Sequence, residues 1–169
     1  IYYNIYLEGR IYVQKGSERF FVNPDMPNGF IEKFVASTVQ CDDLLDSIKG
    51  KGAELIDVFA SDPKVKNSVL DNFRSKGYEI ASAAPGVNSA TAGGVNKGAA
   101  LLGMCERLGI TLDEAMAFGD AENDAPMLRI AGLSFAMANG TEPCKIAAKA
   151  IAPSNADDGV AQMINNYAF

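Results

Sequence analysis

The fold is indicated most clearly by residues 115–126, which read AMAFGDAENDAP. Residues 115–118 are apolar and predict a short buried strand. Residues 125–130 predict a helix with Pro126 in its first turn, where a missing N–H is tolerated. Two carboxylates and an amide therefore follow the C-terminal end of a strand. In open α/β sheets this is where ligands bind.

The polar side chains of this turn are Asp120, Asn123 and Asp124. Their oxygen atoms are hard ligands that suit Mg²⁺, which proteins hold with one or two carboxylates plus water and a substrate phosphate. A second interpretation is that Asp120 and Asn123 only cap the helix that follows. The turn alone does not separate these two interpretations.

The amino-acid composition limits which partners and which catalytic groups the protein can use. The chain has 169 residues, which allows one domain or two small ones, and its net charge is −6 with no basic run. A nucleic-acid partner is therefore not expected. The sequence contains no histidine, which excludes Ser-His and Cys-His nucleophilic pairs and His-ligated metals. Any catalysis must use carboxylates, lysine, hydroxyls, cysteine or a hard metal ion.

The three cysteines are distant from one another and form no C-x-x-C pair: Cys41, Cys105 and Cys144. A disulfide framework or a zinc site is not indicated, and Cys105 is interpreted as a core residue. No signal peptide and no apolar run of membrane-spanning length are recognisable. We expect a cytoplasmic protein that does not interact with a membrane.

Residues 1–86 predict an α+β unit of mainly antiparallel strands with two or three helices. Strands are expected in 2–22, with a hairpin turn at 8–10, and in 54–60 and 78–84, while 23–29 form a loop. Helices are expected at 42–49 and from 61–63 to Gly77, and 30–35 is either a short helix or a strand.

The predicted order of strands and helices changes in the second half of the chain. From Asn88 onward, short apolar strands alternate with helices, which indicates a Rossmann-like parallel sheet over residues 87–169. The expected strands after that first one are 115–118, 133–137 and 150–152, and the expected helices are 97–108, 123–131, 142–149 and 158–166. The domain boundary is expected near residue 86, within Ala84-Pro85-Gly86.

Lys97 opens the helix 97–108. A lysine at such a place is most often merely solvated, but it can also neutralise an anion drawn to the helix terminus. Lys97 precedes Asp120 by 23 residues, about one helix and one strand, so a βαβ connection returns both to the same rim of the sheet. A lysine, two carboxylates and an amide at one rim describe a magnesium-assisted phosphate site.

These motifs resemble the C-terminal half of a haloacid-dehalogenase-like phosphatase, in particular the Cof-type group of sugar-phosphate phosphatases. The resemblance is specific over residues 93–166. It is carried in order by GVNKG (94–98), LGI (108–110), AFGDAEND (117–124), ML (127–128), AG (131–132), AMAN (136–139) and DGV (158–160). Residues 1–86 are similar in style to the α/β cap that these enzymes insert between the two halves of their core.

The resemblance implies a role for each residue of the motif. Lys97 would be a catalytic residue that binds the substrate phosphate, and Asn123 would contact the same phosphate. Asp120 would be a catalytic residue and the side-chain ligand of Mg²⁺, and Asp124 would support the metal shell or the lysine. The implied reaction is phosphoryl transfer to an aspartate, followed by hydrolysis of the aspartyl-phosphate.

The implied substrate is a small phosphorylated metabolite. Its specificity would depend on the cap, where Arg10, Asp25 and Tyr78 are candidates that the sequence does not rank above ordinary surface residues.

The sequence departs from the family pattern in two places. The nucleophile motif Asp-x-Asp-Gly followed by Thr or Val is absent, and the Ser/Thr motif is not identifiable. The sequence starts at Ile1 within a strand-like pattern, so we expect the nucleophile upstream of it. Residues 1–169 alone are then expected to be inactive. They would associate with the missing N-terminal segment, or with another chain, along an exposed sheet edge.

Three other interpretations remain open. A phosphohexomutase of the same superfamily shares the core and the metal but moves phosphate between sugar positions. A non-catalytic fragment would only bind phosphate or a partner. The segment 119–126 also resembles the hinge motif of ion-pumping ATPases, which require membrane spans that are not found in this sequence.

Overall fold

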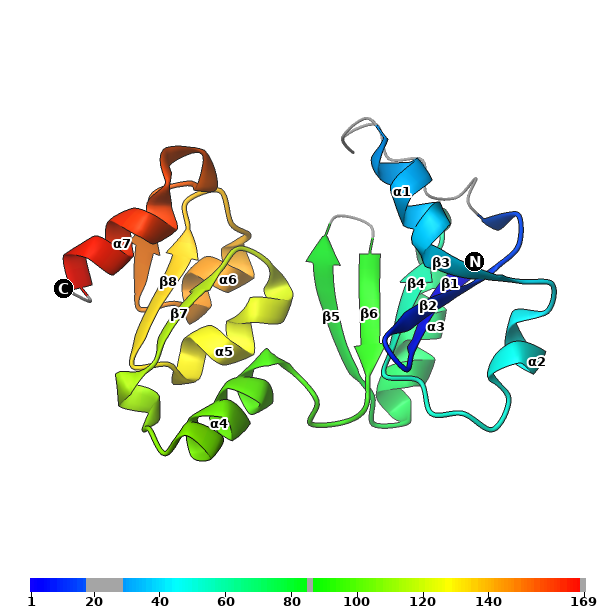
Figure 1. The fold of residues 1–169 in the computed structure, drawn as a ribbon, viewed down its shortest axis with the longest axis horizontal. Coiled ribbons are helices and arrows are strands. Elements are labelled where there is room, and N and C mark those ends of the chain that lie inside the picture. Colours follow the sequence, from blue (N-terminus) through cyan, green and yellow to red (C-terminus); the bar gives the residue numbers. More distant parts are fainter. Residues whose placement is uncertain (18–28, 85–86, 168–169) are drawn as a thin grey trace. The chain divides into compact units, whose positions relative to one another are not determined.

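The computed structural model describes residues 1–17, 29–84 and 87–167 (Figure 1). Contacts divide the chain into two compact units: residues 1–80 with 86–93, and residues 81–85 with 94–169.

The first unit contributes to a six-stranded sheet in the order β3-β2-β1-β4-β6-β5, whose edge strand β5 is divided between the two units after Ile80. Its strands are β1 (Tyr2–Leu7), β2 (Arg10–Gln14), β3 (Thr38–Cys41), β4 (Leu55–Phe59), β5 (Glu79–Ala84) and β6 (Val87–Thr91). The pairs β1–β2, β1–β4 and β4–β6 are antiparallel, whereas β2 and β3 are parallel. The helices are α1 (Phe30–Ser37), α2 (Leu44–Ile48) and α3 (Pro63–Ser75).

Local sequence explains the main turns of this unit. Glu8 and Gly9 both have left-handed backbone angles, with φ of 53° and 69°, as a two-residue hairpin turn requires. This confirms the predicted turn between β1 and β2. Helix α3 begins where the Asp62 carboxylate accepts the N–H of Lys64 at 2.8 Å and ends before Gly77, whose φ is 82°.

The two faces of this sheet differ in polarity. On one face Ile5, Cys41 and Leu44 form a buried apolar cluster, and Leu44 comes from α2, so α2 covers that face. On the other face the strand register aligns Asn4, Asp57 and Ser89 in one row across β1, β4 and β6. The centre of the first unit therefore contains a row of polar side chains.

The second unit contains a three-stranded parallel sheet in the order β7-β8-β9. Its strands are β7 (Met116–Gly119), β8 (Leu133–Met137) and β9 (Ala150–Ala152). Its helices are α4 (Lys97–Leu108), α5 (Ala125–Ile130), α6 (Glu142–Ala147) and α7 (Gly159–Tyr167), with 3-10 turns η2 (Leu112–Glu114), η3 (Glu122–Asp124) and η4 (Asn155–Asp157). The predicted α/β class with a parallel sheet is confirmed.

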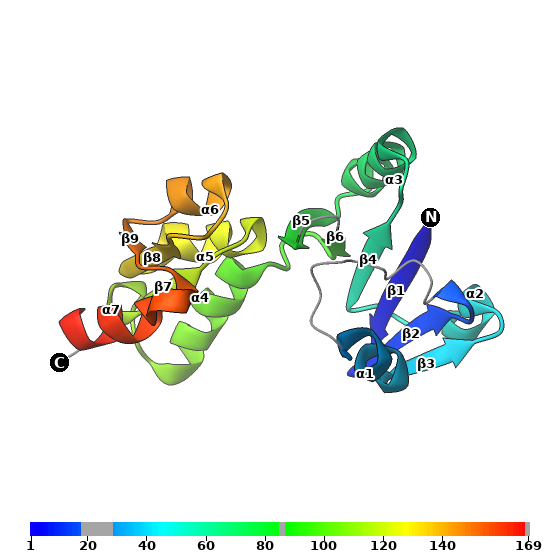
Figure 2. The same cartoon turned by 90° about the horizontal axis from the view of Figure 1, so that it is seen from above.

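Successive side chains in the strands of the second unit point to opposite faces of the sheet, and each face packs into its own apolar core. Ala117 and Ala136 pack against Leu128 of α5 and Cys144 of α6 on one face. The opposite face carries Phe135 and Met137, which pack with Met163 of α7, so helices cover both faces (Figures 1 and 2).

The structure corrects several expected elements. The strand at residues 87–91 was expected to open the parallel unit, but it pairs antiparallel with β4 in the first unit's sheet. The helix expected at 123–131 starts with η3 and continues as α5, and the helix expected at 142–149 ends at Ala147. Residues 30–35 lie in a helix, α1.

The strand and loop expected over 18–28 lie outside the described residues. Of the cap candidates, Arg10 and Tyr78 are exposed, and Asp25 also lies outside the described residues. Within the parts of the chain that the structure describes, no helix combines the length and apolar character needed to cross a membrane.

Candidate active site

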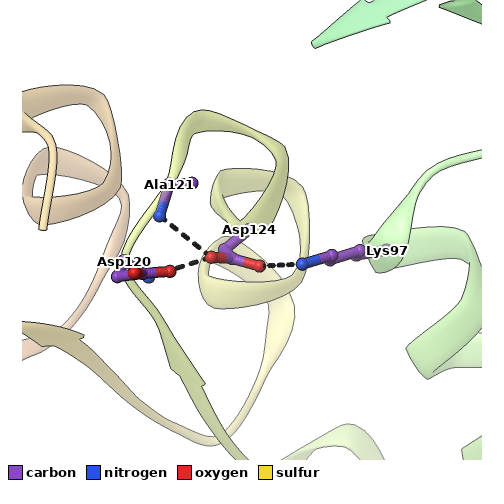
Figure 3. A network of polar contacts seen from close by, with 4 residues as sticks. All are labelled: Lys97, Asp120, Ala121 and Asp124. Carbon is purple, nitrogen blue, oxygen red and sulfur yellow. Dashed lines mark hydrogen bonds and ion pairs between the residues drawn. The ribbon is translucent and has the colours of Figure 1, made fainter. Parts of the chain in front are cut away.

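The turn that follows β7 is built around a buried carboxylate. Asp124 is only 4% exposed, and its Oδ2 accepts the backbone N–H groups of Asp120 at 2.9 Å and Ala121 at 3.0 Å (Figure 3). The side chain of η3 thus fixes the backbone that leaves the strand. These bonds come from Asp124, so they do not support the interpretation that Asp120 and Asn123 cap the helix.

Gly119 makes this arrangement possible. A Cβ atom at Gly119 would lie 2.4 Å from the Cβ of Asp124, closer than real Cβ contacts. Any larger residue would push Asp124 away from the N–H groups that it accepts. The Gly119-Asp120 pair is therefore a packing requirement of the turn as well as a sequence motif.

Lys97 reaches the same carboxylate from a different helix. Its Nζ forms an ion pair and hydrogen bond with Asp124 Oδ1, while 49% of its side chain remains exposed (Figure 3). Helix α4 starts at Lys97 because the Asn96 side chain accepts the N–H of Ala99 at 3.0 Å. A Cβ at Gly98 would lie 2.9 Å from the carbonyl carbon and oxygen of Pro126, so α4 and α5 can approach closely only at a glycine.

These contacts set the charge state of Asp124. Burial acts to raise its pKa, but the hydrogen bond from Lys97, the N–H groups of Ala121 and Asp120, and the Lys97 charge together outweigh burial. The pKa of Asp124 is therefore lowered, and the carboxylate remains ionised. A permanent anion holds the lysine in place.

Asp120 is left with an exposed carboxylate at the same turn. Its backbone carbonyl accepts the N–H of Thr141 at 2.8 Å, so the loop before α6 fixes its main chain. Asn123 Oδ1 is buried and has no hydrogen-bond partner within the part of the chain that the structure describes. An exposed carboxylate and an unpaired amide oxygen are donors of the type that Mg²⁺ prefers.

Cys144 lies beneath this turn, fully buried. Burial, followed by the nearby charges of Asp124 and Asp120, raises the pKa of its thiol. Cys144 is therefore a protonated packing residue and not a nucleophile. Cys105 is also buried, as expected for a core residue.

The structure brings all four predicted residues to one turn: Lys97, Asp120, Asn123 and Asp124. The oxygens of Asp124 face Lys97 and two backbone N–H groups, which places it with the lysine more directly than with a metal. Among the described residues, no group of three or more His, Cys, Asp or Glu side chains is placed to hold a metal ion.

Sequence reasoning included Gly98 and Gly119 in its motifs but did not assign their packing roles, and it missed the Thr141 N–H. A glycine directly after a buried strand and directly after Lys97 was the available signal for the first two.

The chain is similar to proteins of one known family. The model of the haloacid dehalogenase-like hydrolases matches residues 1–164. The chain is 39% identical over 107 residues to the 5-amino-6-(5-phospho-D-ribitylamino)uracil phosphatase YcsE of Bacillus subtilis, an alignment that covers 63% of this chain and 43% of YcsE.

Two solved structures share the fold. One is a haloacid dehalogenase-like hydrolase from B. subtilis, with a TM-score of 0.81 and 23% identity, which covers 98% of this chain and 65% of that one. The other is the sugar phosphatase BT4131 of subclass IIB, with a TM-score of 0.76 and 24% identity over 99% of this chain and 61% of BT4131. The chain thus spans less than two thirds of each of these three proteins.

Proposed function

Because the chain belongs to the haloacid dehalogenase-like hydrolase family, we propose that the complete protein is a Mg²⁺-dependent phosphatase of small phosphorylated metabolites. The observation that carries the proposal is the pairing of Lys97 with buried Asp124, which leaves the Asp120 carboxylate exposed at the same turn. The same turn then offers a phosphate and its metal one lysine, held by Asp124, and one exposed carboxylate, that of Asp120.

Each residue has a distinct part in this proposal. Lys97 binds the substrate phosphate, and the Nδ2 group of Asn123 donates to the same phosphate. Asp120 would be the side-chain ligand of Mg²⁺. Asp124 would support this site by holding Lys97 and by fixing the backbone of Asp120 and Ala121. Bound Mg²⁺ supplies charge neutralisation and orientation of the phosphoryl group.

The nucleophile comes from outside residues 1–169. An aspartate carboxylate attacks phosphorus, the ester bond to the leaving alcohol breaks, and water then hydrolyses the aspartyl-phosphate. Among the described residues β7 pairs with β8 along one edge. We assign the strand that carries this aspartate to the other edge of β7. Residues 1–169 alone are then inactive, and they associate through that edge with their own N-terminal segment or with another chain.

The first unit is assigned as the cap that contacts the leaving group, with β6 (Val87–Thr91) paired with β4 in its sheet. The substrate class rests on the relatives. YcsE is named for a phosphorylated ribityl compound, and BT4131 is described as a sugar phosphatase. Sugar phosphates and similar polyol phosphates are therefore the first substrates to test.

The proposal is tested with the polypeptide encoded by the complete reading frame that contains residues 1–169. Hydrolysis of p-nitrophenyl phosphate is measured with and without Mg²⁺, in the parent protein, in Asp120→Ala and in Glu122→Ala. Glu122 is a matched control because it is an exposed carboxylate of the same turn.

We expect turnover that requires Mg²⁺, is lost in Asp120→Ala and is retained in Glu122→Ala. An equal loss of turnover in both variants, or turnover that does not depend on Mg²⁺, contradicts the assignment of Asp120. Transfer of phosphate between two sugar positions without net hydrolysis identifies the phosphohexomutase instead.

A further inference from the structure

The main chain of Asp120 is held from two sides of the turn. Its N–H donates to Asp124 Oδ2 at 2.9 Å, and the next N–H along the chain, that of Ala121, donates to the same atom at 3.0 Å. From the other side, the N–H of Thr141 donates to the Asp120 carbonyl at 2.8 Å. Thr141 belongs to the loop 138–141 between β8 and α6. The peptide groups before and after the exposed Asp120 carboxylate are thus both fixed, and one of their partners comes from the loop after the neighbouring strand.

Gly140 lets this loop lie directly against Asp120. A Cβ atom at Gly140 would be 3.1 Å from the Cα and the carbonyl oxygen of Asp120, and 2.9 Å from the carbonyl oxygen of Met137. All three are backbone atoms, which cannot turn aside as the end of a flexible side chain can. The φ of Gly140 is not left-handed. The close approach to Asp120, and not an unusual backbone angle, is therefore what requires a glycine at this position.

The Asn139 side chain ties the same loop to the next strand. Its Oδ1 accepts the N–H of Asn155, at the start of η4 after β9, at 3.0 Å. The Ala138 N–H donates to the Ala152 carbonyl at 2.9 Å, which continues the β8–β9 pairing by one bond. Ala138, Asn139 and Thr141 are exposed. Burial of apolar surface therefore does not hold this loop, and its position depends on a few directed contacts.

We propose that the loop 138–141 positions Asp120 for Mg²⁺, with Gly140 and Asn139 as positioning residues. The inference rests on the proposed function, in which Asp120 is the side-chain ligand of Mg²⁺. Mg²⁺ requires nearly ideal octahedral geometry, so a small displacement of a ligating carboxylate weakens its binding. Groups that hold a ligand from behind therefore contribute to metal affinity without touching the metal. Gly140 and Asn139 act in this way, through the main chain of Asp120.

The first measurement uses the complete protein without metal, so it does not depend on catalysis. Amide hydrogen exchange is followed at Thr141, whose N–H donates to the Asp120 carbonyl. We expect exchange at Thr141 to be at least about fivefold faster in Gly140→Ala and in Asn139→Ala, the factor that corresponds to one net hydrogen bond. Asn139→Asp retains an oxygen acceptor for the Asn155 N–H, so it is expected to keep the parent rate.

The second measurement is the Mg²⁺ concentration that gives half-maximal hydrolysis of p-nitrophenyl phosphate. We expect this concentration to rise at least about tenfold in Gly140→Ala and Asn139→Ala, as for other residues that orient a metal ligand. At saturating Mg²⁺, kcat should remain within a few-fold of the parent value, because the bound ion itself holds the Asp120 carboxylate. A merely structural role gives the opposite pattern: unfolding of part of the sample lowers kcat and leaves the Mg²⁺ requirement unchanged.

Two control variants leave the contacts of the loop unchanged. Asn155→Ala keeps the backbone N–H that Asn139 accepts, and Gly103→Ala adds a methyl group where no atom lies within 4 Å. Both are expected to match the parent protein in exchange rate and in Mg²⁺ requirement. If Gly140→Ala does not fold, Asn139→Ala decides alone. Either parent-like exchange or a parent-like Mg²⁺ requirement in the folded loop variants overturns the proposal.

Titration of Mg²⁺, followed at the Asp120 amide resonance, measures metal affinity without turnover and keeps the two proposals distinguishable. Mg²⁺ binding that weakens in the loop variants, without hydrolysis by any of the proteins, refutes the phosphatase alone. Mg²⁺-dependent hydrolysis whose Mg²⁺ requirement is the same in the loop variants refutes the positioning role alone. If Mg²⁺ does not bind to the parent protein, the assignment of Asp120 fails and this inference fails with it.

Discussion

The two units each bury an aspartate to a similar extent but give it different partners. Asp57 in the first unit is 6% exposed, and Asp124 in the second is 4% exposed. Asp57 accepts from two hydroxyls, Tyr6 at 2.9 Å and Ser89 at 2.6 Å, and from the side chain of Asn4. Asp124 instead accepts from the Lys97 ammonium group and two backbone N–H groups.

The different partners move the two pKa values in opposite directions. Burial raises the pKa of Asp57, and the hydrogen bonds from Ser89, Tyr6 and Asn4 compensate only in part. At Asp124 the ammonium and backbone donors outweigh burial and lower the pKa. A buried carboxylate thus serves as a fixed anion only where a cation and fixed N–H dipoles face it. Of these two aspartates only Asp124 is suited to hold Lys97, the proposed catalytic lysine.

The largest effect that tests this contrast is expected from Asp124→Asn. Loss of the anion frees Lys97, because the single amide oxygen of asparagine cannot serve both Lys97 and the two N–H groups. We expect kcat/KM of the complete enzyme for p-nitrophenyl phosphate to fall about 100-fold or more, as when one fixed electrostatic contact is removed from an active site. Asp57→Asn, the matched change in the other unit, is expected to leave kcat/KM within a few-fold. Equal effects of the two substitutions contradict the contrast.

A smaller effect is expected from Gly119→Ala, which forces a Cβ against the Asp124 side chain. We expect a loss of about 1–3 kcal/mol in the free energy of unfolding, as for other overpacked sites, together with reduced turnover. Gly103→Ala is the control, because a Cβ at Gly103 within α4 meets no atom within 4 Å. It should stabilise the protein by about 0.5–1 kcal/mol, as alanine does in a helix interior. Denaturant unfolding measures the stability of both variants. If Gly119→Ala is as stable as the parent protein, the close approach of Gly119 to Asp124 is refuted.

The smallest expected effect is a difference in pH dependence between the two units. The raised pKa of Asp57 gives a stabilising contribution that is present below the unfolded-state pKa of about 3.9 and is lost as pH rises through the folded-state value. The lowered pKa of Asp124 contributes stability above the unfolded-state pKa, which is lost as pH falls through the folded-state value.

This difference can be read from hydrogen exchange, which reports on each unit separately. Measured between pH 4 and 7, β1 and β4 should lose protection against opening as pH rises in the parent protein, and Asp57→Asn should remove that trend. A trend that persists unchanged in Asp57→Asn shows that another group causes it.

Much of the second unit was predictable from local sequence. The predicted bounds of α4 (97–108) and β8 (133–137) agree with the structure. In the structure the Asn96 and Gly109 caps mark the two ends of α4. Lys97 and Asp120 were placed at one rim through a βαβ connection whose expected first strand, β6, lies in the other sheet, so that reasoning was wrong. Lys97 nevertheless contacts the turn after β7 through Asp124.

Other features depend on contacts between distant residues and were not predictable in this way. Strand β6 was assigned to the wrong sheet, because pairing with β4 depends on tertiary contacts that a five-residue strand does not encode. The Lys97–Asp124 pair requires the close approach at Gly98, which periodicity does not show. The polar row through Asp57 had one unused signal, an aspartate in the middle of an apolar strand.

The central claim is that the partners of the two aspartates, and not their burial, decide which one remains charged. The most direct test is a titration of the side-chain carboxyl ¹³C resonances of Asp57 and Asp124 in one metal-free sample, assigned with the two Asn variants. We predict that Asp57 titrates above the ordinary aspartate range and Asp124 below it. If both titrate together, or if Asp124 titrates above Asp57, Lys97 is not held by a fixed anion and the proposed site is wrong.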